Sequence, residues 1–472
     1  MFIGRKKEVE ILKNTYKSGQ SEFVTVYGRR RIGKTFLVRY VFNNSFTFEH
    51  SGLAGVSMQK QLQAWYFSLK EYGLTAKHTP KNWIEAFDLL KQLIKSSRKK
   101  KKVIFIDEMP WLDTKRSGFV SALEFFWNSW ASSRNDILLI VCGSSTSWII
   151  NKIIKNHGGL HNRVTKKIHL QPFTLHECES YAKAAKLHFS RYQVLECYMI
   201  IGGVPFYWSC LESGKTLSEN IDDNFFDKQG QLYGEFHQLY ASLFANSEPY
   251  IEVIKVLGQK KIGMTRNELL EKGKLEDNGR LTAILTDLEY CGFIRKYNSI
   301  GHKAKNATYQ LIDAYTLFYF HFIAKSNNNR YLWSSIVNSP VHKTWSGLAF
   351  EMACLNHSKQ IKDALGISGI MSEEYSWIFK SKDSSVKSAQ IDMVIDRKDN
   401  VINLCEMKFS TTKFNITKKY MNELNEKLDV FLSQIPMYKS ANIVMVTTYG
   451  LVKNMYSHNI FKTITLNDIF KQ

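Results

Sequence analysis

The chain has 472 residues, 44% of them hydrophobic and 23% charged, which is the composition of a globular protein long enough for two to four domains. Its formal net charge of +21 favours polyanionic partners, nucleic acid before an anionic membrane. The seven cysteines are scattered without a C-x-x-C pair, and no apolar run approaches the ~18 residues of a membrane span. We therefore expect a reduced, cytoplasmic protein with no zinc site, disulfide framework or membrane segment.

An apolar run at residues 23–27 leads into Gly28-Arg29-Arg30-Arg31-Ile32-Gly33-Lys34-Thr35, and a helical pattern follows. The G-x-x-x-x-G-K-[ST] spacing predicts a phosphate-binding loop between a strand and a helix. Backbone N–H groups of such a loop and the positive end of the helix attract phosphate. Lys34 is predicted to contact the β- and γ-phosphates, and the Thr35 hydroxyl to bind Mg²⁺. We expect a nucleoside triphosphate to bind here.

A second apolar strand, residues 103–107, ends in Asp107-Glu108. Asp107 is predicted to hold Mg²⁺, directly or through water, and Glu108 to orient and deprotonate the attacking water. The basic run at residues 98–102 precedes this strand and therefore lies at the opposite end of the sheet from the nucleotide. For that run, a solvated loop and a nucleic-acid contact remain equal alternatives.

A third apolar strand, residues 137–142, leads into Ser144 and Ser145. Small polar side chains at this strand end are candidate sensors of the γ-phosphate or of the attacking water, although an ordinary turn explains them nearly as well. Arg163 falls between a helical segment and the strand at 167–170, where an arginine finger would lie.

Together with Phe2-Ile3-Gly4-Arg5 and Gly202-Gly203-Val204-Pro205, these motifs resemble those of AAA+/STAND-type ATPases. More narrowly, they resemble the archaeal-ATPase-like group of prokaryotic ATPases that carries a DUF234-type C-terminal region. The resemblance implies ATP and Mg²⁺ as ligands, and a helical lid in which Pro205 touches the adenine. It also implies that Arg163 acts on the nucleotide of a neighbouring subunit, and hence a homo-oligomer. Without the resemblance, Gly-Gly-Val-Pro is only a helix break.

The middle of the chain shows three helical patterns, at 251–257, from Thr265 and at 278–290, before a hairpin of 293–297 with 308–311. This order predicts a winged helix-turn-helix, which binds DNA through its third helix. That helix carries one basic residue, Arg280, so an internal spacer remains the alternative. On the DNA-binding interpretation the wing carries the basic residues Arg295, Lys296, Lys303 and Lys305.

The C-terminal part begins with a helix running from 345 toward 366. After it the pattern predicts strands at 376–379, 390–396 and 402–408, a helix at 417–432, and strands at 442–446 and 463–466. This order places Glu351 on the first helix, Asp392 on a strand and Glu406-x-Lys408 on the next strand. The arrangement resembles the PD-(D/E)xK restriction-endonuclease-like fold, although Ile391 stands where that pattern often has proline.

The register of the 390–408 hairpin decides whether this site forms. Asp392 lies across from Glu406 only if the turn centres on Asp399, which requires an odd loop or a bulge, whereas an even loop pairs Asp392 with Cys405. If the residues converge, Glu351, Asp392 and Glu406 are predicted to hold Mg²⁺. Lys408 would then position a water or stabilise the phosphorane charge. The alternative is an ordinary hairpin in which Glu406 pairs with Lys408.

We therefore predict an α/β protein with a phosphate-loop ATPase core (1–172), a helical lid (173–245), a winged helix-turn-helix (246–312), a helical linker (313–344) and a nuclease-like domain (345–472). The predicted function is an ATP-hydrolysing switch coupled to a Mg²⁺-dependent nuclease-like domain acting on nucleic acid, with DNA favoured. The alternative is an ATP-dependent nucleic-acid or protein-binding switch whose C-terminal domain does not catalyse. A protein-remodelling ATPase is the weaker third possibility.

Overall fold

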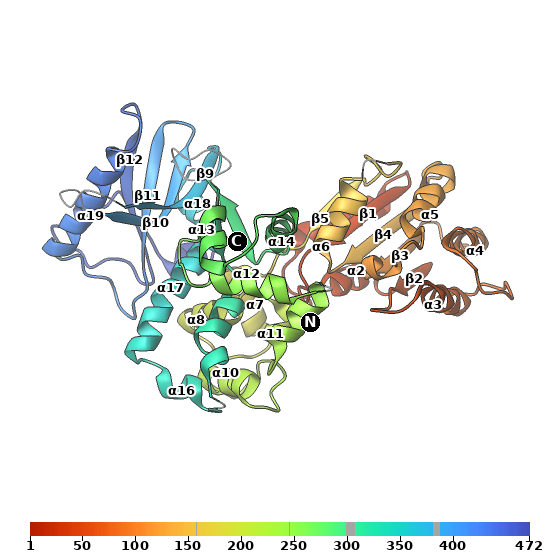
Figure 1. Cartoon of the computed structure of the whole chain (residues 1–472), viewed down its shortest axis with the longest axis horizontal. Helices are drawn as coiled ribbons and strands as arrows, with labels where there is room; N and C mark the ends of the chain where they lie inside the picture. Colours follow the sequence, from red (N-terminus) through yellow and green to blue (C-terminus); the bar gives the residue numbers. More distant parts are fainter. Residues whose placement is uncertain (157, 245, 299–306, 328, 381–387) are drawn as a thin grey trace. The chain divides into compact units, whose positions relative to one another are not determined.

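The computed structural model describes residues 1–156, 158–244, 246–298, 307–327, 329–380 and 388–472. The chain separates into two units, Met1–Gln171 and Pro172–Gln472, and each is described by itself (Figure 1).

The first unit is built on a parallel five-stranded sheet with the order β2-β3-β4-β1-β5. Its central strands are buried along almost their whole length, because both faces of a parallel sheet are covered by helices. The strands are β1 (Glu22–Tyr27), β2 (Phe48–Ser51), β3 (Lys102–Asp107), β4 (Ile137–Gly143) and β5 (Lys166–His169). The helices are α1 (Lys6–Lys17), α2 (Lys34–Phe42), α3 (Met58–Glu71), α4 (Trp83–Ser96), α5 (Phe119–Phe126) and α6 (Thr146–Trp148). A 3₁₀ turn follows β3 (Met109–Leu112), and π-helical segments continue α5 (Trp127–Ala131) and α6 (Ile149–Ile154).

Helices pack on both faces of this sheet. Leu12 of α1 and Leu37 of α2 belong to one apolar cluster with one face of the strands. Trp65 of α3, Trp83 of α4 and Phe119 of α5 belong to the cluster on the opposite face. Because β1, β3 and β4 are parallel, their carboxyl ends meet at one edge of the sheet, which is where such folds bind ligands. The predicted α/β phosphate-loop core with a parallel sheet is confirmed.

Helices open the second unit, and a close backbone crossing joins the start of this region to its middle. Phe173 N–H donates to the Gly203 carbonyl over 2.6 Å. A Cβ on Gly203 would lie 1.9 Å from the Phe173 carbonyl oxygen, so only glycine fits at this position. Pro205 occupies the first turn of α9, where its missing N–H removes no helical hydrogen bond. The helices are α7 (Leu175–Ala184), α8 (Arg191–Ile201), α9 (Pro205–Ser209), α10 (Leu217–Ile221) and α11 (Glu235–Leu243), with a π-helical turn (Asp222–Phe226) after α10.

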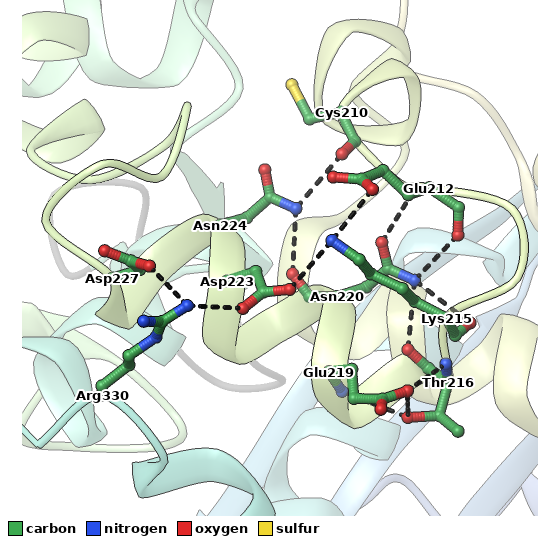
Figure 2. A network of polar contacts seen from close by, with 10 residues as sticks. All are labelled: Cys210, Glu212, Lys215, Thr216, Glu219, Asn220, Asp223, Asn224, Asp227 and Arg330. Carbon is green, nitrogen blue, oxygen red and sulfur yellow. Dashed lines mark hydrogen bonds and ion pairs between the residues drawn. The ribbon is translucent and has the colours of Figure 1, made fainter.

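Polar contacts fix the predicted linker to this helical region. The Arg330 guanidinium lies 2.8 Å from Asp227 and 3.6 Å from Asp223 (Figure 2). The buried Asp222 carboxylate accepts the Trp333 N–H over 2.9 Å. Two helices belong to this stretch, α15 (Ala314–His321) and α16 (Leu332–Ile336), with a 3₁₀ turn (Ile323–Lys325) between them.

A three-stranded antiparallel sheet of order β6-β8-β7 forms with three helices between the helical region and this linker. Thr265 and Glu268 form the capping box that opens the second of these helices, as the sequence predicts. The elements are α12 (Glu248–Leu257), β6 (Met264–Thr265), α13 (Arg266–Gly273), α14 (Gly279–Tyr290), β7 (Ile294–Tyr297) and β8 (Thr308–Leu311). Lys303 and Lys305, predicted for the wing, lie outside the described residues.

Arg295 is not free for a partner, contrary to its predicted place among the wing's basic residues. Its Nε donates to Gln310 Oε1 over 2.6 Å, and its Nη2 donates to Ser376 Oγ over 3.0 Å. The guanidinium also lies 4.8 Å from the ring centroid of Tyr297. Lys296, by contrast, is exposed.

The C-terminal region is a mixed five-stranded sheet with the order β13-β12-β11-β10-β9 (Figure 1). The β9, β10 and β11 strands are antiparallel, whereas β11, β12 and β13 are parallel, with α19 in the crossover between β11 and β12. The strands are β9 (Ser372–Phe379), β10 (Ala389–Arg397), β11 (Val401–Lys408), β12 (Ser440–Thr447) and β13 (Lys462–Ile464). The helices are α17 (Pro340–Asn356), α18 (Ser358–Leu365), α19 (Lys418–Leu432) and α20 (Leu466–Ile469), and a 3₁₀ turn (Ser457–Asn459) precedes β13.

Three features of the C-terminal region differ from the sequence prediction. The single helix expected from 345 is two helices, α17 and α18, because the chain bends at His357, whose φ of −116° is not helical. The α17 helix begins at Pro340, after the N-cap Ser339, and thus inside the predicted linker. The last strand ends at Ile464, because Thr465 caps α20.

Candidate nucleotide site and a charged cluster in the C-terminal region

The phosphate-binding loop connects β1 to α2 at the carboxyl edge of the first sheet. Gly33, with φ of +88°, is the N-cap of α2, and Arg31 also has a positive φ of 69°. The buried Lys34 ammonium donates to the carbonyls of Gly28 and Arg29 over 2.9 and 2.8 Å. The lysine charge is thus held inside the curve of the loop, where an anionic phosphate would meet it.

The ends of β3 and α2 meet through a short hydrogen bond. The Thr35 hydroxyl donates to Asp107 Oδ2 over 2.6 Å, and Asp107 Oδ1 accepts the Glu108 N–H over 2.9 Å. A hydroxyl and a carboxylate are oxygen ligands of the kind that Mg²⁺ takes beside nucleotide phosphates. Thr35 and Asp107 therefore fit a magnesium ion, which would neutralise phosphate charge when bound.

Glu108 is held in place by the end of β4. Its backbone φ is +44°, a left-handed conformation that few non-glycine residues adopt. Its Oε2 accepts the Ser144 hydroxyl over 2.9 Å and the Ser144 N–H over 3.3 Å. The conformation directs the carboxylate across the sheet edge toward β4, which suits a group that must orient water beside the phosphates.

The other residues predicted for the nucleotide site differ in their location and exposure. Ser145 precedes α6 and is half-buried, and Arg163 is exposed in the turn before β5. Pro205 belongs to the second unit, so its contact with adenine stays a prediction. Within the loop, Arg29 and Ile32 are buried, Arg31 and Gly33 are half-buried, and Arg30 is exposed.

The N-terminal box contributes contacts that the motif alone does not reveal. Arg5 Nη2 donates to the Ile32 carbonyl of the loop at 3.5 Å. Phe2 stacks on Tyr40 of α2 with ring centroids 3.8 Å apart. Arg5 therefore ties the N-terminal box to the phosphate-binding loop, 27 positions later in the sequence.

In the second unit, two of the predicted metal ligands meet at one lysine. The Lys261 ammonium forms an ion pair with Glu351 of α17 and lies 3.2 Å from Asp392 Oδ1 of β10. Asp392 Oδ2 accepts the Met407 N–H over 3.0 Å. Both carboxylates are buried or nearly so, with side-chain exposures of 12% for Glu351 and 8% for Asp392.

The hairpin takes the register that the site requires. Met393 pairs with Cys405 and Val394 with Leu404, so the loop is the odd, three-residue alternative. Asn400, with φ of 67°, supplies the left-handed residue that such loops use. A bulge against β9 falls between Ile391 and Val394, which places both side chains in the same apolar cluster and interrupts the alternation at Asp392.

Glu406 is held by α19 rather than by Asp392. Lys427 Nζ lies 2.9 Å from both Glu406 oxygens, and the Tyr420 hydroxyl donates to Oε1 over 3.2 Å. Lys408 Nζ lies 3.2 Å from the same oxygen. The Glu406–Lys408 pair, which belongs to the alternative to a metal-binding face, is present, and α19 adds a second lysine to it.

Burial and charge separate the pKa values of the three carboxyls. Burial, and then the Asp392 charge, raise the pKa of Glu351 to about 8. Burial, and then Glu406, raise the pKa of Asp392. Burial acts in the same direction on Glu406, but the charges of Lys427 and Lys408 outweigh it and lower the pKa of Glu406.

Among the described residues, no three His, Cys, Asp or Glu side chains stand close enough to hold a metal ion as they lie. Glu351 and Asp392 already share one cation, which is a charge arrangement that a divalent ion would satisfy, whereas Glu406 would have to turn away from α19. Lys427 was missed in the sequence, although it lies among the inward-facing Leu424, Leu428 and Phe431 of its helix, an unusual position for lysine. No motif or periodic pattern in the sequence indicates a role for Lys261.

No helix in the described parts of the chain is long and apolar enough to cross a membrane. The seven cysteines all lie in described parts of the chain, where each is buried and none forms a disulfide.

Comparisons with known proteins bear on the first 209 residues most directly. Residues 2–209 match the model of a family described as an ATPase domain predominantly from Archaea. An uncharacterised protein of Methanocaldococcus jannaschii is 25% identical over 328 residues, 68% of this chain and 69% of that protein. An uncharacterised ATP-binding protein of the same archaeon is 39% identical over 44 residues, 9% of this chain and 75% of that protein.

Among solved structures, the chain is similar to a Walker-type ATPase of Pyrococcus abyssi, with a TM-score of 0.47 and 15% identity over 68% of this chain and 96% of that one. It is also similar to the ORC2 protein of Aeropyrum pernix, with a TM-score of 0.45 and 13% identity over 71% of this chain and 95% of that one. Because residues 2–209 match its model, this part of the chain is an ATPase domain of the family described as predominantly from Archaea, and the chain is an ATPase.

Proposed function

We propose that the chain is an ATP-hydrolysing switch whose C-terminal region is a Mg²⁺-dependent nuclease-like domain acting on nucleic acid, DNA in the first instance. One observation carries the second half of this proposal. Glu351, Asp392 and the Glu406-x-Lys408 pair come from a helix and two adjacent strands, and they influence one another electrostatically inside a mostly buried cluster. Burying carboxylates and lysines together costs free energy unless the charges are paired or bind a metal ion, and a metal ion would be bound by the same carboxylates.

In the ATPase half, this chain's own residues have separate roles. Lys34 neutralises β- and γ-phosphate charge, and Thr35 with Asp107 would hold Mg²⁺, which supplies further charge neutralisation when bound. Glu108 orients the attacking water and accepts its proton, while Ser144 keeps the Glu108 carboxylate at the sheet edge. Arg163 acts as a finger on the nucleotide of a neighbouring copy, and its exposed position in the turn before β5 leaves it accessible to such a copy. Ser145 is a candidate phosphate sensor, and Pro205 a candidate adenine contact.

In the second unit, the order α12-β6-α13-α14-β7-β8 with strand order β6-β8-β7 supports a winged helix-turn-helix between the lid and the nuclease-like domain. The net charge of +21 supports a polyanionic partner. The third helix, α14, adds little charge to a DNA contact because Arg280 is its only basic residue. We therefore assign the module a spacer role and place nucleic-acid binding mainly at the C-terminal region.

In the nuclease-like half, Glu351 and Asp392 would hold the metal ion, with Glu406 as a third ligand once it leaves α19. The ion would lower the pKa of a bound water when present. Lys408 is a third exposed and next to Glu406, so its ammonium can reach a phosphate oxygen and stabilise negative charge there.

The test uses the purified full chain with Mg²⁺, ATP, and single-stranded and double-stranded DNA and RNA. Cleavage should require Asp392 and Lys408, so Asp392→Asn and Lys408→Met should abolish it while leaving ATP turnover intact. Lys398→Met serves as the matched control, because Lys398 is an exposed lysine of the same hairpin paired with Glu373. Equal cleavage by Asp392→Asn and the parent chain would rule out the nuclease assignment.

The second candidate is an ATP-dependent switch whose C-terminal domain binds nucleic acid or protein without catalysis. A specific observation favours it, because three lysines (Lys261, Lys408 and Lys427) already balance the cluster carboxylates. Binding of DNA that persists in EDTA, with no cleavage of any nucleic acid by the folded chain, would favour this candidate.

A further inference from the structure

The cation between Glu351 and Asp392 comes from a distant part of the chain. Lys261 lies in the turn between α12 and β6, 90 positions before Glu351 in the sequence. Its ammonium pairs with the Glu351 carboxylate and lies 3.2 Å from Asp392 Oδ1. A single positive charge therefore sits between the two carboxylates to which the metal ion is assigned above.

The backbone that carries Lys261 is fixed by the β7 and β8 strands, and the next residue packs against the C-terminal sheet. Gln310 Nε2 donates to the Lys261 carbonyl over 2.7 Å, and the Tyr297 hydroxyl donates to the Ile262 carbonyl over 2.6 Å. The Ile262 and Tyr297 side chains are buried in one apolar cluster with Trp377 of β9. The turn thus belongs to the wall of the carboxylate cluster.

The Lys261 side chain is less constrained than its backbone. It is 32% exposed, whereas the two carboxylates that it contacts are nearly buried. It also lines an open cavity of about 730 Å³ together with Glu351, Lys325 and His321. A change of side-chain rotamer can therefore carry the ammonium out of the cluster and into this cavity while Ile262 stays packed.

We propose that Lys261 occupies the cation position of the Glu351–Asp392 pair in the resting chain, and that a divalent ion and Lys261 bind there in alternation. The inference rests on the metal site proposed above. An ammonium and a divalent cation repel each other at contact distance, so both cannot be held between the same two carboxylates. The winged-helix module thus keeps the nuclease-like site in a metal-poor state until Lys261 is withdrawn.

The cavity indicates what withdraws it. Lys325 and His321 line the same space among mostly apolar residues, so a phosphodiester entering there would find two nitrogen donors and would attract the Lys261 ammonium away from the carboxylates. Nucleic acid in the cavity and a metal ion in the cluster should therefore favour each other's binding.

The experiment measures Mn²⁺ binding by electron paramagnetic resonance in the full chain without nucleotide. An Asp107→Ala background removes the carboxylate among the two residues assigned to the metal ion of the ATP site. Lys261→Met keeps the length of the side chain and removes its charge. We expect Mn²⁺ to bind about tenfold more tightly or better, since a unit charge in contact with the site is removed. Lys260→Met is the matched control, because the neighbouring Lys260 pairs with Glu268 instead, and its Mn²⁺ affinity should match the parent.

Folding is controlled by thermal unfolding with and without Mn²⁺. Lys261→Met should lower the Tm without metal, because it leaves two carboxylates unbalanced, and Mn²⁺ should restore that Tm. The double variant Lys261→Met/Glu351→Gln should lose the gain in Mn²⁺ affinity. A lowered Tm that Mn²⁺ does not restore would mean that Lys261 is a permanent structural pair, and would overturn the inference.

Cleavage assays test the proposed nuclease activity separately from the alternation of Lys261 and the metal ion. Tighter Mn²⁺ binding by Lys261→Met without cleavage by any variant would reject nuclease turnover and uphold the alternation. Cleavage by the parent chain with equal Mn²⁺ affinity in Lys261→Met would reject the alternation and uphold the nuclease. Absence of a Mn²⁺ site in every variant would reject both.

Discussion

The Thr35 hydroxyl donates to the Asp107 carboxylate over 2.6 Å and so joins segments that are 72 positions apart in the sequence. Asp107 ends β3 and Thr35 lies beyond the end of β1, and these strands are not neighbours because β4 lies between them. The contact therefore crosses the carboxyl end of β4, where Ser144 donates to Glu108. Glu108 and Thr35 reach the nucleotide edge from either side of that strand.

Replacing Glu108 by Gln should separate ATP binding from hydrolysis. The amide keeps the shape of the side chain but cannot accept a proton from water, so kcat should fall about 10²–10⁴-fold. Nucleotide affinity, measured by calorimetry, should stay within a factor of a few of the parent value. Ser144→Ala should reduce kcat less, because the Ser144 N–H still reaches Glu108 at 3.3 Å. Normal phosphate release by Glu108→Gln would show that another residue activates the water.

Gly203→Ala should destabilise the second unit. The new Cβ would lie 1.9 Å from the Phe173 carbonyl oxygen, so the two backbone segments must separate. The expected loss is about 1–3 kcal/mol of unfolding free energy, measured by denaturant titration. Gly347→Ala is the control, since Gly347 lies within α17 and a Cβ there meets nothing within 4 Å. Equal stability of the two variants would mean that the crossing is not as tight as described.

Lys101 and Lys100 should behave differently although they are neighbours in the basic run. The buried Lys101 ammonium donates to the carbonyls of Ser18, Gln20 and Asn135 over 3.0, 2.6 and 3.4 Å. Lys101→Met leaves these carbonyls without their donor and should cost about 1–3 kcal/mol of stability. Lys100 is exposed, so Lys100→Met should change stability by less than about 0.5 kcal/mol.

Salt-dependent binding to a short DNA duplex tests whether the basic run at residues 98–102 contacts nucleic acid or is only a loop of the fold. Only Lys100→Met should weaken binding if the run contacts phosphates, because Lys101 is already committed to the fold. An unchanged duplex affinity for Lys100→Met would mean that the basic run has only a structural role at this end of the sheet.

Stability of the second unit should fall between pH 6.5 and pH 4 because of His357. Burial lowers the pKa of His357 from 6.5 to about 4, while its Nε2 accepts the Leu175 N–H over 2.9 Å. In this window the unfolded chain binds a proton that the folded chain does not, so the unfolding free energy rises with pH and is lost as pH falls. The full effect at His357 is about 3 kcal/mol.

His357→Gln keeps one donor and one acceptor but removes the titration. The variant's stability curve should therefore be flatter than the parent curve between pH 4 and pH 6.5. His458→Gln, at an exposed position, should leave the curve unchanged. Parallel curves for His357→Gln and the parent would show that His357 titrates normally in the folded chain.

The ATPase half could be predicted well because its signals are local. The glycine and lysine spacing of the loop, and apolar strands followed by Asp107-Glu108 and Ser144, depend on residues that are close in sequence. The Thr35–Asp107 contact then follows from the parallel sheet. In the C-terminal hairpin, the composition of the turn left two registers open, and the left-handed Asn400 decides between them.

Contacts between distant elements could not be predicted. Arg295 looks like an exposed wing residue, but its guanidinium reaches Ser376, 81 positions away. The bulge between Ile391 and Val394 breaks the alternation on which the predicted common face depended. The Lys261 and Lys427 pairs depend on packing between separate elements, which charge and periodicity along one segment do not encode.

The link from Ser144 to Glu108 gives the end of β4 a mechanical role. The chain runs from Ser144 through α6 and a π-helical segment toward the turn that carries Arg163. A neighbouring molecule that displaced Ser144 would also move the Glu108 carboxylate, because both Ser144 contacts end on Glu108 Oε2. The timing of ATP hydrolysis would then be set from outside the nucleotide pocket, without any change in the residues that touch the nucleotide.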